Sequence, residues 1–96
     1  MLFTVRQDLL VDAELEDACQ KYDRTQDAWD MILWVLARDP TVGYPLSEGG
    51  TVRSFVFEGS WAHEMPTIQI IHVFEDPYVT IKSAIFRDPR SHGGTA

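Results

Sequence analysis

The sequence contains one cysteine, Cys19, and no apolar run of membrane-spanning length. A single cysteine excludes an internal disulfide and favours a reducing compartment. A transmembrane helix needs about 20 consecutive apolar residues, and residues 1–5 lack the basic start and the apolar stretch of a signal peptide. We therefore expect a soluble cytoplasmic protein with no membrane attachment.

Positive charge is also scarce. Eight Lys and Arg residues stand against 15 Asp and Glu residues, which gives a formal net charge of -7. Such a charge repels phosphate backbones and lowers the rate of encounter with nucleic acid, so direct binding to free DNA is not expected. The acids are concentrated in residues 1–40, where nine of them accompany four basic residues. This half of the chain predicts an acidic helical surface.

Motifs of common catalytic and cofactor sites are missing as well. The chain has no glycine-rich phosphate loop and no Gly-x-Ser-x-Gly sequence around a nucleophile. His63, His72 and His92 lack the short paired spacing of zinc ligands, and we expect no metal and no cofactor. The alternation of residues 67–74 places His72 among large apolar residues, which favours a core or edge histidine bonded to the backbone over a catalytic one.

The residues that are present suit a single domain. The chain has 96 residues, of which 45% are hydrophobic, enough for one core. We assign residues 1–88 to this domain and expect residues 89–96 to form a flexible tail. Residues 2–5 alternate in character and are rich in strand-forming side chains, so they predict a short first strand.

Two helices are predicted next. The first follows an N-cap at Asp12 and buries an apolar stripe at helical spacing. The second begins with an N-cap at Thr25 and ends near Asp39, because Pro40 disfavours the α conformation at the residue before it. The stripe of the first helix consists of Val11, Leu15, Ala18, Cys19 and Tyr22.

The middle of the second helix, residues 28–37, is apolar nearly all round. A helix tolerates this only if most of its circumference is covered, so we expect it to lie between the first helix and a sheet. Its core anchors are predicted to be Trp29, Ile32, Leu33 and Leu36.

Three strands are predicted in the second half, over residues 52–58, 67–74 and 78–86. Their short connections favour antiparallel pairing over crossovers. By alternation, Ile85 is expected to face the helices. Lys82 and Phe86 are expected on the opposite face, toward solvent or a ligand. The expected fold class is α+β, with a first strand, a two-helix hairpin and a three-stranded antiparallel meander.

No motif identifies a catalytic set, so catalytic residues are unknown and the only candidates are basic residues near the strand ends and in the tail. Antiparallel pairing would bring strand ends to one rim, where cations would bind a phosphate or a carboxylate. Ordinary ion pairing with Glu58, Asp76 or Asp88 is the alternative. The weak catalytic candidates are Arg53, Lys82, Arg87 and His92, and Arg90 belongs with Arg53, Lys82 and Arg87 to the expected basic rim.

Four local motifs accompany this order of elements. They are residues 34–40 with Gly43, the Val52-Arg53 strand start, residues 65–70, and the segments 79–81 and 85–87. Together they resemble the RelE/ParE family of small bacterial toxins. The resemblance implies a toxin of a type II toxin-antitoxin system, of the kind used in plasmid stabilization, in complex with an antitoxin that wraps around it. It also implies a target, either the ribosome, through mRNA cleavage, or gyrase.

Ribosome-dependent members of this family commonly carry a His-Arg pair and a tyrosine near the C-terminus. Here the matching pair is Phe86-Arg87, and no tyrosine follows Tyr78. Cleavage at the 2′-hydroxyl needs one group to take a proton and another to give one, so we expect mRNA cleavage to be weak or lost. The favoured interpretation is a toxin-like protein that acts by binding protein through its helical hairpin and sheet edge, alone or as a homodimer.

Two alternative functions stay open. One is a residual ribosome-dependent endoribonuclease that uses the four basic candidates. The other is an acidic inhibitor whose helical surface mimics nucleic acid toward a basic partner.

Overall fold

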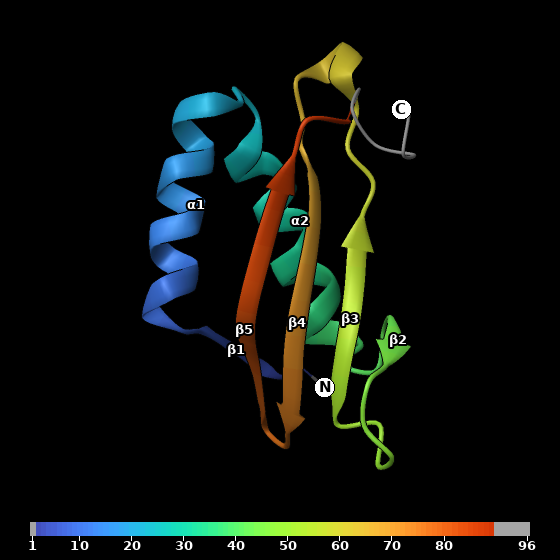
Figure 1. Ribbon diagram of the computed structural model, residues 1–96. Coiled ribbons are helices and arrows are strands. Elements are labelled where there is room, and N and C mark those ends of the chain that lie inside the picture. Colours follow the sequence, from blue (N-terminus) through green and yellow to red (C-terminus); the bar gives the residue numbers. More distant parts are fainter. Residues whose placement is uncertain (1, 90–96) are drawn as a thin grey trace.

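A five-stranded mixed sheet carries two helices on one of its faces (Figure 1). The computed structural model describes residues 2–89. The helices are α1 (Leu9–Lys21) and α2 (Thr25–Arg38), and a short 3₁₀ turn spans Trp61–His63. The strands are β1 (Thr4–Gln7), β2 (Tyr44–Pro45), β3 (Val52–Phe57), β4 (Thr67–Glu75) and β5 (Tyr78–Arg87).

The strands lie in the order β1-β5-β4-β3-β2. β3, β4 and β5 pair antiparallel with their chain neighbours, whereas β1 pairs with β5 in parallel. The two-residue β2 adds an antiparallel partner to β3, so the sheet has one strand more than the four predicted. The α+β class is confirmed. The extra strand was missed because two residues are too few to show an alternating pattern.

α1 begins four residues before the predicted start. Its N-cap is Asp8, and Asp12 lies in the first turn, where a carboxylate favours the positive end of the helix dipole. Val11 and Ala18 are buried, but Cys19 is exposed, so the prediction that Cys19 lies in the buried stripe is wrong. The reason is that α1 packs mainly against β5. This contact covers the helix face that carries Val11 and Ala18, and Cys19 lies at the side of that face.

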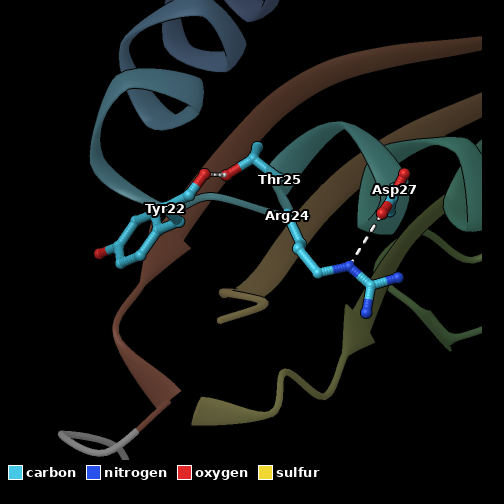
Figure 2. Close-up of polar contacts among 4 residues, drawn as sticks. All are labelled: Tyr22, Arg24, Thr25 and Asp27. Carbon is cyan, nitrogen blue, oxygen red and sulfur yellow. Dashed lines mark hydrogen bonds and ion pairs between the residues drawn. The ribbon is translucent and has the colours of Figure 1, made fainter. Parts of the chain in front are cut away.

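The junction of the two helices is drawn in Figure 2. Thr25 is the first residue of α2 rather than its N-cap, which is Arg24. The buried Thr25 hydroxyl lies 3.0 Å from the carbonyl oxygen of Tyr22 and 3.1 Å from that of Ala18, both at the end of α1. Arg24 Nε donates to Asp27 in the first turn of α2 over 2.9 Å. The Thr25 bonds therefore join the start of α2 to the end of α1, whereas the Arg24 bond lies within the start of α2.

α2 supplies the centre of the core. Three of its four predicted anchors, Trp29, Ile32 and Leu36, are buried, and Leu33 packs half-buried against them. The expectation that most of the circumference of α2 is covered is not met at Met31 and Trp34, whose side chains are 47% and 59% exposed. The Arg38 guanidinium lies 3.9 Å from the centre of the Trp34 ring and shields part of it. Within residues 2–89, no helix is long and apolar enough to span a membrane.

A β-bulge decides which side chains of β5 meet the helices. Ile71 of β4 pairs with Ser83 and the next residue, His72, pairs with Ile81, which leaves Lys82 as an extra residue in β5. The inward face therefore changes register after Lys82. Phe86 packs into the core against Trp29, and Ile85 is 48% exposed, so the predicted orientations of these two residues are reversed.

Candidate protein-binding site at the edge of the sheet

The predicted basic candidates do not form one site. Arg53 is half-buried, and its guanidinium donates to the carbonyl oxygens of Gly50 over 2.9 Å and Gly43 over 3.2 Å. Its hydrogen bonds hold the loop before β3 in place. Because both of these hydrogen bonds reach backbone acceptors on either side of β2, Arg53 serves the local structure around β2.

Lys82 and Arg87 are engaged elsewhere. Lys82 Nζ lies 3.3 Å from a carboxylate oxygen of Asp8, a partner that the sequence did not indicate. Arg87 donates to the Gln69 side chain over 2.9 Å. Arg53 lies opposite His72 and Arg87 opposite Thr67, five residues apart on β4. This separation is roughly 17 Å along the strand, so the expected common rim is not formed.

The two remaining histidine predictions have different outcomes. His92, like Arg90, lies outside the described residues, so its candidacy stays a prediction. His72 is fully buried, and its Nε2 lies 3.1 Å from the carbonyl oxygen of Pro40, which confirms the predicted histidine bonded to the backbone and places it in the core rather than at an edge. Burial lowers the pKa of His72, and the positive charge of Arg53 lowers it further against the opposing effect of the Pro40 bond.

The clearest candidate site is an unpaired stretch of β5. β1 has four residues and β5 has ten, and the β1 pairing covers Tyr78–Ile81 alone. Beyond the bulge, residues 83–87 have no strand partner on the side away from β4 within the described part of the chain. An open strand edge presents backbone N–H and C=O groups to any further strand. Figure 1 shows α1 running beside this open edge.

A groove separates α1 from the open half of β5. It has a volume of about 470 Å³ and is lined by apolar residues of both elements, including Val11, Ala18, Ala84 and Phe86. At its rim, the Leu10 side chain is 79% exposed. An apolar floor beside free backbone groups suits an extended peptide segment.

Charged side chains along the groove are mostly neutralised in pairs. Lys21 lies 3.0 Å from Asp17, whose hydrogen bond and charge raise the pKa of Lys21, and Lys82 is paired with Asp8. Glu14 also lines the groove and makes no ion pair within residues 2–89. The groove therefore keeps a negative charge.

Sequence reasoning located this site only in outline. The helical hairpin and a sheet edge were predicted as the binding surface, but not which edge. The usable signal was the difference in length between the predicted first strand, residues 2–5, and the predicted last strand, residues 78–86.

In the part of the chain that the structure describes, no group of three or more His, Cys, Asp and Glu residues could hold a metal ion. Comparison with protein-family models, with curated proteins and with solved structures finds no match to the chain.

Proposed function

We propose that this protein acts by binding another protein, which adds a strand to the open half of β5 beside α1. The observation that carries the proposal is the unpaired stretch 83–87 next to an apolar groove. In strand addition, main-chain hydrogen bonds supply affinity, and alternate side chains enter pockets that supply specificity. Both components lie side by side here. The open edge of β3 is shorter, because β2 pairs with Arg53 and Ser54 and leaves Phe55–Phe57.

The biological role that we propose is that of a toxin-like component of a bacterial type II toxin-antitoxin system, working in the cytoplasm with a RelE/ParE-like arrangement of its elements. The antitoxin is the proposed partner, and ribosome or gyrase the proposed target. The four sequence motifs support this role, as does an element order in which one strand and two helices precede the antiparallel strands β3, β4 and β5, with the two-residue β2 as an addition. Arg53, Lys82 and Arg87 each contact a different partner within the protein and do not form one site, which supports weak or absent mRNA cleavage.

An acidic mimic of nucleic acid is the second candidate. The observation that favours it is the exposure of Asp12 and Glu16 on the part of α1 outside the groove. Such an inhibitor would use the outer surface of α1 and would not need the open edge of β5.

Co-expression with the product of the adjacent small gene, followed by gel filtration, tests the proposed function. We expect a stable complex that is lost in Leu10→Asp, because this charge would enter the apolar rim of the groove. Leu9→Asp is the matched control, since Leu9 is 85% exposed and does not line the groove. Elution of the chain alone or only as a homodimer would contradict protein binding. Equal loss of the complex in both variants would contradict the assigned surface.

A ribosome assay separates this role from the ribonuclease alternative. Ribosomes programmed with a defined message should show no codon-specific cuts when the protein is added, since Phe86 stands before Arg87 where the resembled toxins commonly carry histidine, and the net charge of -7 repels RNA. Strong cleavage that disappears in Arg87→Ala would overturn this part of the proposal.

A further inference from the structure

The groove beside β5 continues past the end of α1. A second hollow of about 190 Å³ shares Lys21 and Tyr22 with the groove and reaches Trp61 and Glu64 in the turn before β4. The Trp61 side chain is 64% exposed. The two hollows are neighbours that share these two residues, and together they reach from Leu10, beside the open half of β5, to Trp61; we call them the path.

This path carries uncompensated negative charge. Its two lysines are already paired, Lys21 with Asp17 and Lys82 with Asp8. Three further carboxylates along the path make no ion pair within residues 2–89. They are Glu14 in the groove, and Asp23 and Glu64 in the second hollow. A bound segment of opposite charge would compensate them, and the net charge of -7 would accelerate its approach.

We propose that the segment added to β5 is extended and basic, and that one of its Lys or Arg side chains seats against Trp61 near Asp23 and Glu64. This inference rests on the proposed function. Side chains of an added strand alternate between the two faces of the sheet, so every second residue would face α1 and its carboxylates. At the far end of the path, the exposed indole ring offers a face to a cation.

The same charges disfavour other occupants of the path. A second copy of the chain would also carry a net charge of -7, so pairing of two open β5 edges would bring the carboxylates of both α1 helices together. A nucleic acid would place its phosphates beside Glu14 and Glu64, and these carboxylates would repel the phosphates. A basic peptide satisfies both the backbone edge and the carboxylates.

Fluorescence polarisation with synthetic peptides tests the inference on the full chain. The probe is a labelled eight-residue peptide of alternating lysine and threonine, and its charge-reversed control alternates glutamate and threonine. We expect the lysine peptide to bind, with an affinity that falls as salt is raised, and the glutamate peptide not to bind. Trp61→Ala should weaken binding by about two- to five-fold, as expected for loss of a cation–π contact.

Matched variants separate this path from general attraction to an acidic protein. Trp34→Ala removes a tryptophan of similar exposure on the outer side of α2 and should leave binding unchanged. Glu14→Gln should weaken binding by about two-fold, whereas Glu16→Gln, on the same helix outside the groove, should not.

Three results would overturn the inference. They are absence of binding, equal binding of the two peptides, and equal losses in the paired variants. The proposed function is judged separately, by protection of backbone amides 83–87 from hydrogen exchange when the protein partner binds. If the partner protects these amides but the lysine peptide does not bind, the basic segment is refuted and strand addition stands.

Discussion

Acidification from pH 7.5 to pH 5 should destabilise this protein partly through His72. This side chain is fully buried on β4. Its Nε2 faces the carbonyl oxygen of Pro40 and must carry the proton that it donates, while Nδ1 has no partner within the described residues. A second proton would have to enter at Nδ1, in a buried position close to Arg53. The folded state therefore holds His72 neutral, and the pKa of His72 is lowered.

The sign and size of the effect follow from linkage. The unfolded chain binds a proton at this histidine below its ordinary pKa of about 6.5, whereas the folded protein resists it. The stabilising contribution is complete above this value and is lost as the pH falls toward the lowered pKa of the folded state. The slope approaches about 1.4 kcal/mol per pH unit, and the loss reaches at most about 2 kcal/mol at pH 5.

Urea unfolding across this pH range, with His72→Gln as the test variant, measures the effect. Glutamine keeps an amide donor that can reach Pro40 but does not titrate, so the variant should lose less stability on acidification than the parent. His63→Gln removes an exposed histidine in the turn before β4 and should retain the pH dependence of the parent. Identical pH dependence in the parent and His72→Gln would refute the argument.

Two further substitutions, each with a control, test the core and the segments on either side of β2 by urea unfolding. Ile32→Ala should lower the free energy of unfolding by about 2 to 5 kcal/mol, because this side chain is fully buried, while Met31→Ala, half-exposed on the same helix, should change it by at most about 1 kcal/mol. Gly43→Ala should cost about 2 kcal/mol or more, since Gly43 has φ +95° and an added Cβ would clash with the Ser54 carbonyl oxygen. Gly49→Ala, with open space around the new methyl group, should stay within about 0.5 kcal/mol of the parent. Equal effects within either pair would show that the packing is assigned incorrectly.

The sequence predicted most elements because local chemistry determines them. Asp39-Pro40 ends α2 as expected, and the alternation of β4 placed Ile68, Ile70 and His72 on the buried face. Alternation failed in β5, where Ile85 and Phe86 are both large and apolar. Either could face inward, and the choice depends on the bulge at Lys82, which tertiary pairing sets.

The site was less predictable than the fold. Whether Cys19 is buried depends on the orientation in which α1 packs on the sheet, and the spacing of apolar residues along the helix does not determine that orientation. The partners of Arg53 and Lys82 come from a loop and from Asp8 before α1, which only the folded topology brings close. The open edge itself arises because β1 ends while β5 continues, a property of the register between two strands distant in sequence.

Backbone hydrogen exchange, measured residue by residue with and without the bound protein partner, tests the central claim most directly. Strand addition to β5 predicts new protection at amides within residues 83–87 whose N–H groups point away from β4. It also predicts little change at the other open edge, Phe55–Phe57 of β3. Protection at Phe55–Phe57 or on the outer side of α2, with β5 unchanged, would contradict the account.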